Sequence, residues 1–308
     1  MNNTAIPKIS VCVITYNHGL YIRDCLESIV TQNTTFDFEV IVGDDGSTDA
    51  TTQIVQEYVD RYPNRVIHVL HQPKVGGTQN FLDCHNRARG DFVAHMDGDD
   101  LMLPGKLQAQ ANALESDPSC TAVWHRVDFF DDAGGFCSGK EADLSPFVNG
   151  IVSFDSAIRL GFVGVHSSLM YRRSARGPEP QGTDVLDLFR TWDVLSSGDG
   201  RILDQVLGQY RVGASGSLTV SSQLRIRRLS IDHARYFLAR FPETRRSFFV
   251  FSVSNAIVDS KNLRRTAFDF FLFALETLSF VSPGTILGNL RDVRRIQVPW
   301  KRCRRVTG

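Results

Sequence analysis

The stretch Phe92-Val-Ala-His-Met-Asp-Gly-Asp-Asp100 joins a short apolar run to three carboxylates, at positions 97, 99 and 100. An apolar run of this length is typical of a buried strand, and the aspartates then fall at its carboxyl end. Like charges so close together repel each other unless water or a cation neutralises them. Two of these carboxylates suit a hard divalent cation that keeps positions open for water or phosphate oxygens.

Two other interpretations of these aspartates compete with metal binding. A solvated turn is the simpler one, because Asp-Gly-Asp is common in turns. A calcium-binding EF-hand loop starting at Asp97 needs glycine at its sixth position and glutamate at its twelfth. Met102 and Gln108 occupy those positions, which excludes the calcium loop. The buried strand before the aspartates favours a metal site at the rim of a sheet over a bare turn.

Strands and helices alternate on both sides of this stretch. The hydrophobic periodicity predicts strands at 9–14, 38–42, 66–70, 92–96 and 120–130, and helices at 21–32, 50–62, 81–89 and 104–115. This alternation predicts an α/β fold with a doubly wound, mostly parallel sheet flanked by helices. Ligands of such sheets bind beyond the carboxyl ends of the strands. Three polar clusters fall there, namely Thr15-Tyr16-Asn17, Asp44-Asp45 and Asp97-Gly98-Asp99.

The second cluster lies at the end of a predicted strand and just before a helix. Ser47 or Asp49 is suited to cap that helix. Asp44 and Asp45 precede the cap, where a carboxylate can accept a hydrogen bond from a base or from a ribose hydroxyl. Gly46 allows the backbone to approach a ligand closely.

Charge divides the chain into two regions. Residues 1–220 carry 17 basic and 28 acidic side chains, whereas residues 221–308 carry 17 basic and 6 acidic ones. We therefore predict a catalytic domain over 1–220 and a basic helical region over 221–308, with helices at 223–241, 247–259 and 263–280. The basic region either packs on the first domain or makes peripheral contact with an anionic membrane, for which residues 301–305 are the better candidate. The acidic first domain argues against nucleic-acid binding.

Cysteine usage and hydropathy predict the compartment. The six cysteines show no paired spacing, which is typical of reduced thiols in the cytosol and not of a disulfide framework or a zinc site. No apolar run reaches the roughly 18 residues that span a bilayer, and no secretory signal is visible at the N-terminus. We expect a cytoplasmic protein, with peripheral contact to the inner face of a membrane.

Three motifs in register carry a family resemblance. The segments ITYNHGLYIRDCLESIVTQ (14–32), FEVIVGDDGSTDAT (38–51) and ARGDFVAHMDGDDLMLPGKLQAQ (88–110) resemble the nucleotide-sugar domain of a family 2 glycosyltransferase of the GT-A fold. The resemblance covers residues 8–215. The chain has neither a GxGxxG segment after its first strand nor a P-loop, so the sequence does not support a dinucleotide or ATP site.

The resemblance implies roles for the residues at the strand ends. Asp97 and Asp99 match the DxD element: Asp97 would reach the ribose or the water shell of the metal, and Asp99 would bind Mn²⁺ or Mg²⁺ and thereby the diphosphate, with Asp100 behind them. Either Asp44 or Asp45 would contact uracil or thymine and its ribose. The residues expected to bind the nucleotide-sugar are Thr15, Tyr16, Asn17, Asp44, Asp45, Asp97 and Arg211.

On the acceptor side, the resemblance implies a catalytic base. Asp184 stands at the matching place, although it is also suited to cap the helix that runs to residue 195. Asp187 would share a helix face with it. His166 either faces the site or is a structural histidine. Arg211 matches a segment that holds the diphosphate, but Gly213 stands where a histidine is common, so either Arg211 does that work or residues 213–217 form a mobile lid.

Together these features predict a metal-dependent, inverting glycosyltransferase. It would move a sugar from a UDP- or dTDP-sugar to a glycan or lipid-linked acceptor, as in bacterial surface polysaccharide assembly. A nucleotidyltransferase would need a glycine-rich basic loop after the first strand, and residues 14–21 contain none. A degenerate nucleotide-sugar-binding or scaffold protein is the remaining alternative.

Overall fold

The computed structural model describes residues 6–306 except 134, 142, 180, 181, 183 and 214–222, with side chains as far as residue 296 apart from those of 141 and 223. The strands are β1 Ile9–Thr15, β2 Phe38–Asp44, β3 Val66–Leu70, β4 Phe92–Asp97, β5 Leu101–Met102, β6 Cys120–Phe130, β7 Phe136–Cys137, β8 Ile151–Val152, β9 Met170–Arg172 and β10 Asp199–Arg211. The α-helices are α1 Ile22–Val30, α2 Thr51–Arg61, α3 Gly77–Asn86, α4 Lys106–Ser116, α5 Phe154–Leu160, α6 Asp187–Leu195, α8 Gln223–Arg240, α9 Arg245–Lys261, α10 Thr266–Glu276 and α11 Pro283–Val306.

The strands form one mixed sheet in the order β3-β2-β1-β4-β9-β6-β10-β5, with β7 and β8 paired at its side. The first four strands of this order are parallel. Strand β9 then lies antiparallel between β4 and β6, and β10 runs parallel to β6. The predicted α/β class is confirmed, and the sheet is more mixed than expected because the short β9 has no strand-length periodicity that a sequence pattern reveals.

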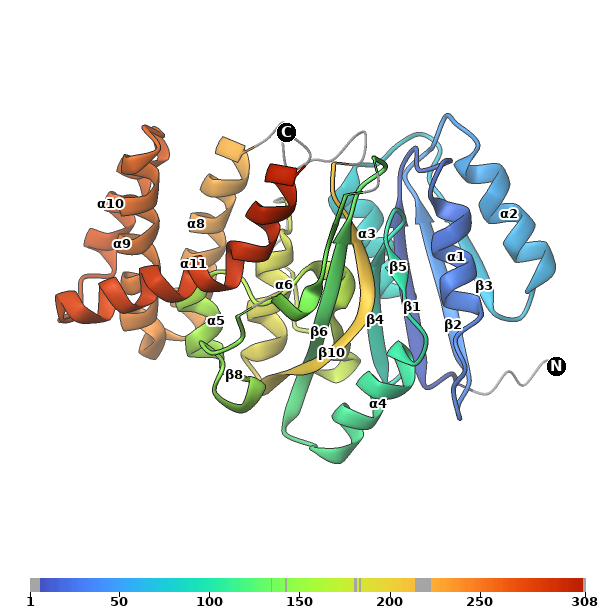
Figure 1. The fold of residues 1–308 in the computed structure, drawn as a ribbon, viewed down its shortest axis with the longest axis horizontal. Coiled ribbons are helices and arrows are strands. Elements are labelled where there is room, and N and C mark those ends of the chain that lie inside the picture. The colour runs from blue at the N-terminus through green and yellow to red at the C-terminus, as the bar shows by residue number, and fades with distance from the viewer. Residues whose placement is uncertain are drawn as a thin grey trace.

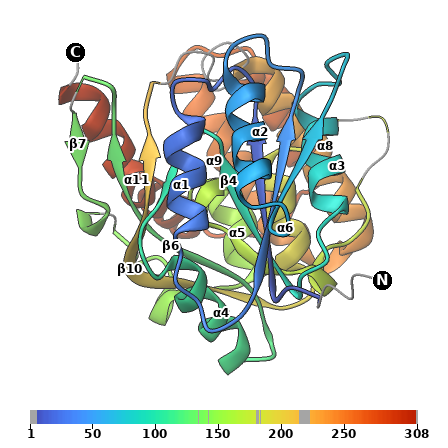
Figure 2. The ribbon, with the colours of Figure 1, turned by 90° about the vertical axis from the view of Figure 1, so that its right-hand side faces the viewer.

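The sheet separates two hydrophobic cores, because side chains of a strand alternate between its faces. On β1, Val11 and Val13 pack with the residues of α1, α2 and α4. Cys12 points to the opposite face, where the core includes residues of α3, α5 and α6. Figure 2 shows α1 and α2 in front of the strands and α5 and α6 behind them. The parallel strands are thus covered on both sides, which explains their nearly continuous apolar sequences.

The C-terminal helices pack on the second of these cores. Trp192 of α6 is fully buried, and its ring lies 5.8, 5.3 and 5.5 Å from the rings of Phe237, Phe248 and Phe251. Figure 1 shows α8, α9 and α10 at the end of the molecule opposite to β3 and α2, with α11 running from that end toward the middle. Losing a buried tryptophan of this kind costs about 3–5 kcal/mol of stability. The predicted domain boundary at 220 lies outside the described residues.

The predicted elements correspond closely to the observed ones, with one notable shift. Helix α3 begins at Gly77, four residues before the predicted start, after Gly76 with its positive φ of 94°. Only a glycine adopts such a conformation without strain. Among the described residues, every helix is too short or too polar to cross a bilayer.

Candidate active site

The three predicted polar clusters come together at one edge of the sheet. Strand β1 lies between β2 and β4, with Thr15 opposite Asp44 and Ile14 opposite Asp97. The carboxyl ends of three parallel neighbours therefore meet, as the strand order requires. The prediction that these segments share one rim is confirmed.

Gly98 allows the end of β4 to approach the end of β1. Its main-chain N–H donates to the carbonyl oxygen of Ile14 at 2.9 Å. A Cβ atom at this position would lie only 2.9 Å from both Thr15 Oγ1 and His18 Nδ1. Those two polar atoms are buried and lack a hydrogen-bond partner within the described structure. Buried polar atoms of this kind normally have a hydrogen-bond partner.

Asp97 is held from inside the sheet and remains 38% exposed. Its Oδ1 lies 3.1 Å from Nε2 of the buried His95, and its main-chain N–H donates to Ser167 Oγ at 3.0 Å. Burial by itself raises the pKa of Asp97, but the hydrogen bond from His95 and the charges of His95 and His166 outweigh it and lower the pKa to about 2. Asp97 is therefore ionised at neutral pH.

Asp99 and Asp100 differ in their surroundings. Asp100 is buried, and its two oxygens accept from Ser167 Oγ at 2.5 Å and from the main-chain N–H of Arg211 at 2.8 Å. Asp99 is half-buried beside Asp97. Burial and the charge of Asp97 raise the pKa of Asp99, and burial together with both neighbours raises the pKa of Asp100 well above its ordinary value. A bound cation would relieve this repulsion.

Arg211 anchors the loop that carries these aspartates. Its Nε donates to the carbonyl oxygen of Asp99 at 3.0 Å, and its guanidinium forms an ion pair with Asp132. The guanidinium carbon lies 4.3 and 4.4 Å from the ring centres of Tyr21 and Phe130. The cation thus makes a cation–π contact with each of these rings. Asp132 and Tyr21 were not predicted, because no spacing in the sequence relates them to Arg211.

Asp44 and Asp45 are the two candidates for contact with the nucleobase. Both are buried, but they have different hydrogen-bond partners. Asp44 accepts hydrogen bonds from the N–H and the Oγ of Ser47 and from Thr52 Oγ1, and it lies 3.7 Å from His68 Nε2. Burial raises the pKa of Asp44, yet the nearby His68 and the hydrogen bonds from Ser47 and Thr52 overcome this and lower the pKa to about 2. Asp44 thus organises the turn.

Asp45 connects the β2 turn to the loop before α3. Its Oδ1 accepts from the N–H groups of Val75 and Gly76 at 2.8 and 2.9 Å, and its Oδ2 lies 3.8 Å from Lys74 Nζ. The ammonium group of Lys74 also lies 3.2 Å from the ring centre of Tyr16, which is 38% exposed. Lys74 was not predicted, since an isolated lysine in a loop carries no pattern.

Asn17 joins the first two clusters. Its N–H donates to Ser47 Oγ at 2.9 Å, and its Oδ1 accepts from the N–H of Thr48 at 2.8 Å. Asn17 has a φ of 54°, a left-handed conformation that asparagine tolerates better than most residues. The side chain thus fixes the loop after β1 against the loop after β2.

A chain of buried polar side chains leads inward from Asp97. His95 Nδ1 lies 3.1 Å from His85 Nε2, and His85 Nδ1 lies 2.8 Å from the hydroxyl of Tyr171. His166 stacks on His95 with ring centres 3.7 Å apart. Burial lowers the pKa of His95, and it lowers the pKa of His85 well below its ordinary value. In the sequence, only the histidine at position 95 of an otherwise apolar strand indicates these buried polar side chains.

Helix α6 begins only at Asp187, after Leu186 as its N-cap residue. Asp184 therefore neither caps the helix nor shares a helix face with Asp187, and both of these expectations were wrong. Asp184 accepts from Thr78 Oγ1 at 3.0 Å and forms an ion pair with Arg225 of α8. Asp187 lies 3.1 Å from His166 Nδ1 and is 75% exposed. Burial lowers the pKa of His166, but Asp187 more than compensates and the net shift is upward. His166 thus connects Asp187 to His95 and the aspartate rim.

Two further expectations concern the segment after β10. Gly213 has a φ of 81°, which glycine adopts readily and histidine does not. The rest of the predicted lid, residues 214–217, lies outside the described residues. The side chains of the basic tail at 301–305 also lie outside them.

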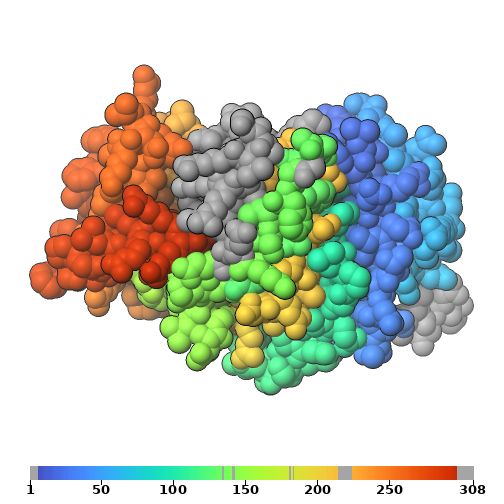
Figure 3. Space-filling model, in the orientation of Figure 1, coloured from blue at the N-terminus to red at the C-terminus, as the bar shows by residue number. Residues whose placement is uncertain are grey.

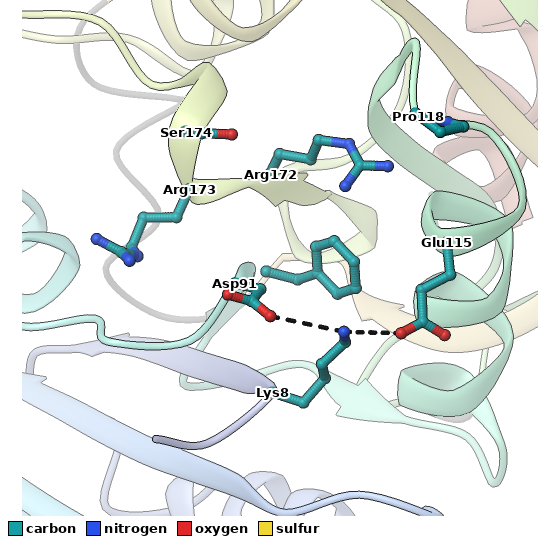
Figure 4. A pocket seen from close by; sticks show the side chains of 8 residues that line it. Lys8, Asp91, Glu115, Pro118, Arg172, Arg173 and Ser174 are labelled. Atoms are coloured by element: carbon teal, nitrogen blue, oxygen red, sulfur yellow. Dashed lines mark ion pairs between the residues drawn. The ribbon is translucent and has the colours of Figure 1, made fainter. Parts of the chain in front are cut away.

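A pocket of about 460 Å³ lies away from this rim, by the amino ends of β1 and β4. Figure 4 shows Lys8 between Asp91 and Glu115, with Nζ to carboxylate distances of 3.5 and 2.7 Å. Arg172, which also lines this pocket, donates to main-chain carbonyls. Lys8, Asp91 and Glu115 are thus paired with each other, and the pocket is separate from the aspartate rim.

A family model matches more than half of the chain. The chain belongs to glycosyl transferase family 2, whose model matches residues 10–176. The predicted family is confirmed.

The chain also resembles individual proteins. It is 31% identical over 210 residues to the uncharacterized protein Rv1520 of Mycobacterium tuberculosis, covering 68% of this chain and 60% of that one. It is 36% identical over 128 residues to the uncharacterized glycosyltransferase YibD of Escherichia coli, and the match covers 40% of this chain and 36% of YibD. The chain thus spans less than two thirds of the length of these relatives.

Solved structures share the fold at low identity. The structure of Staphylococcus aureus TarS 1–349 in complex with UDP-GlcNAc matches 94% of this chain and 81% of its own, with a TM-score of 0.62 and 20% identity. The structure of the mannosyltransferase PcManGT of Pyrobaculum calidifontis, in complex with GDP-Man and Mn²⁺, matches 97% of this chain and 84% of its own. The TM-score is 0.56 and the sequence identity is 16%.

Proposed function

We propose that this protein is a metal-dependent, inverting glycosyltransferase that uses a UDP- or dTDP-sugar as donor. The observation that carries the proposal is the pair of carboxylates at the end of β4. Asp97 is held ionised by His95, whereas burial and the charge of Asp97 hinder the ionisation of Asp99. A divalent cation removes that conflict, and a donor diphosphate completes its coordination.

The residues present fit Mn²⁺ or Mg²⁺ bound together with a diphosphate. Among the described residues, no group of three or more His, Cys, Asp or Glu side chains could hold a metal ion by itself. Asp97 and Asp99 would supply the protein oxygens, and water and phosphate oxygens the remainder, as is usual for magnesium sites on nucleotides. When bound, the cation supplies positive charge that stabilises the departing nucleoside diphosphate.

The nucleoside would lie over the ends of β1 and β2. The exposed ring of Tyr16 offers a face for a base, and Thr15 Oγ1 is a buried polar atom without a partner in the described part of the chain. Asp45 is the better candidate for the base or ribose contact, because Asp44 already accepts three hydrogen bonds from Ser47 and Thr52. We propose that Asp44 and Asn17 hold the loops that form this nucleoside site and do not themselves contact the nucleoside.

The chemistry requires a base for the acceptor hydroxyl. Asp184 is the predicted base, and it would take the proton as the hydroxyl oxygen attacks the anomeric carbon. The bond from that carbon to the diphosphate oxygen breaks on the opposite side, which inverts the configuration. Asp187 is a second candidate, because it is 75% exposed and contacts His166, whereas the oxygens of Asp184 contact Thr78 and Arg225.

Arg211 has two roles in this proposal. Its main-chain N–H and its Nε hold Asp100 and the carbonyl of Asp99, which fixes the direction of the DxD carboxylates. We propose that its guanidinium, which pairs with Asp132, also favours the binding of a diphosphate at this rim.

We further propose a glycan or lipid-linked acceptor, as in bacterial surface polysaccharide assembly, and a cytoplasmic location with peripheral contact to the inner face of the membrane. The donors named for TarS and PcManGT, UDP-GlcNAc and GDP-Man, belong to the same chemical class as the proposed donor. A degenerate binding or scaffold protein remains the alternative to an active enzyme.

Release of nucleoside diphosphate distinguishes the enzyme from a degenerate binder. The wild-type protein is incubated with UDP- and dTDP-sugars, with Mn²⁺ or with a chelator, and free UDP or dTDP is measured. We expect slow hydrolysis of one donor that depends on the metal and is lost in Asp99→Asn. Donor binding without any hydrolysis or transfer would support the degenerate binder instead.

A further inference from the structure

Helix α10 is apolar on both of its sides, but only one side is covered. Phe270 and Phe273 are fully buried against the neighbouring helices. The opposite side carries Phe268, Phe271 and Leu275, which are 64%, 53% and 54% exposed. A helix that is apolar all round is normally buried all round. The outer side of α10 is therefore an apolar surface that lacks a covering partner within the described residues.

The outer residues form one stripe. Phe268, Phe271, Leu272 and Leu275 follow the spacing i, i+3, i+4 and i+7, which places them on one side of a helix. The apolar surface continues beyond the helix with Leu278, which is 67% exposed. Figure 3 shows the helices after residue 240 forming one end of the molecule. Exposed patches of this kind mark sites of protein or membrane contact.

The acidic residues of α10 are neutralised within the protein. Asp269 pairs with Arg228 at 3.0 Å, and Glu276 pairs with Arg235 at 2.5 Å, both across to α8. These carboxylates thus do not offset the positive charge at the outer surface. Arg265 lies three residues before Phe268 in a helical conformation and is exposed, so it borders the apolar stripe.

A second exposed cation precedes the helix in the sequence. Lys261, the last residue of α9, is exposed and stands four positions before Arg265. The whole region 221–308 carries 17 basic and 6 acidic residues. An apolar stripe flanked by lysine and arginine fits an anionic bilayer, whose surface attracts the cations while its interior accepts the aromatic side chains. A second copy of this chain would bring the same cations against one another, which disfavours self-association.

We propose that the outer side of α10, with Phe268, Phe271, Leu272 and Leu275, inserts into the headgroup region of an anionic lipid bilayer. Arg265 and its neighbouring cations hold it there by contact with lipid phosphates. The sequence pattern favoured packing for this helix and membrane contact for the tail at 301–305. Because the stripe is exposed, we include α10 itself in the proposed membrane-contact surface, together with that tail. This inference is independent of the transfer reaction, because its readout is lipid binding alone.

Sedimentation with vesicles tests the proposal. Wild-type protein is mixed with vesicles of phosphatidylcholine alone or with anionic phosphatidylglycerol added. We expect binding to the anionic vesicles that weakens as salt is raised. Replacing Phe268 and Phe271 together by glutamine is expected to weaken that binding about tenfold, since two aromatic anchors are lost. Arg265→Glu is expected to weaken it as well.

The matched control is Val148→Gln, which replaces a 73% exposed apolar residue on the catalytic part of the chain. It should bind vesicles as the wild type does, and all variants should keep the wild-type thermal midpoint, because the replaced side chains are exposed. Equal binding by the wild type and the Phe268/Phe271 variant would overturn the proposal and leave the tail as the contact. A wild-type dimer in light scattering that this variant converts to a monomer would also overturn it.

Discussion

His95 and Asp97 stand two residues apart on β4, and Nε2 of His95 lies 3.1 Å from Oδ1 of Asp97. Residues i and i+2 of a strand share a face, so the buried histidine supports the rim carboxylate from below. The direction of Asp97 is thus set by the interior of the sheet, through His85 and Tyr171, and not by solvent.

Replacing His95 should therefore weaken metal binding as well as stability. His95→Leu removes the donor to Asp97 and leaves His85 with one partner fewer. We expect a loss of about 1–3 kcal/mol in the free energy of unfolding and metal affinity lowered by about 10-fold or more. Chemical denaturation and titration calorimetry with Mn²⁺ and UDP measure the two effects. His125→Leu, at another buried histidine on β6, is the control and should reduce stability alone.

The neighbouring serines of the turn before β9 offer a second test. Ser167 Oγ donates to Asp100 and accepts from the N–H of Asp97, whereas Ser168 Oγ donates only to the carbonyl of Val165 among the contacts described. Both side chains are buried. Ser167→Ala and Ser168→Ala should each cost about 1–2 kcal/mol of stability. Only Ser167→Ala should raise the KM for the donor, and equal KM values would show that Ser167 does not orient the aspartates.

Asp44 should make stability depend on pH in the acid range. Its pKa is lowered from 3.8 to about 2 in the folded protein, so the folded state favours the charged form. This contribution is present above pH 3.8 and is lost as the pH falls through the folded pKa. It amounts to about 2 kcal/mol at neutral pH. Asp44→Asn should be less stable than the wild type at pH 7, with the difference shrinking between pH 4 and 2 in denaturant titrations.

The assignment of the base is tested by two single variants. If Asp184 is the base, Asp184→Asn should lower kcat at least 100-fold, in line with the usual share of a general base, and should leave donor affinity unchanged. Asp187→Asn should then keep most of the activity. The reverse result would assign the base to Asp187. Near-normal transfer by both variants would mean that neither carboxylate takes the proton.

Most of the rim could be predicted from the sequence because it depends on local patterns. Apolar runs of strand length end at Thr15, Asp44 and Asp97, and parallel strands bring such ends to one edge. The choice between Asp44 and Asp45 could not be made, because adjacent residues face different partners and the turn geometry decides which.

Arg211 was predicted as a site residue, but the contacts that hold Asp99 and Asp100 could not be predicted, because they join distant parts of the chain. Ser167 and Arg211 meet Asp100 across 67 and 111 residues, and the three-residue strand β9 that orders this region has no recognisable periodicity. The outer stripe of α10 was equally hidden, since an apolar helix has the same sequence whether one side or both sides are covered.

The central claim is that the aspartate rim binds a nucleotide-sugar through a divalent cation. A thermal-shift measurement of wild type and Asp99→Asn, with UDP-, dTDP-, GDP- and CDP-sugars and with or without Mn²⁺, tests it most directly. We predict that a UDP- or dTDP-sugar stabilises the wild type only when Mn²⁺ is present, and that Asp99→Asn shows no such shift although it folds. Equal stabilisation with and without metal, or no stabilisation by any of the donors, would contradict the claim.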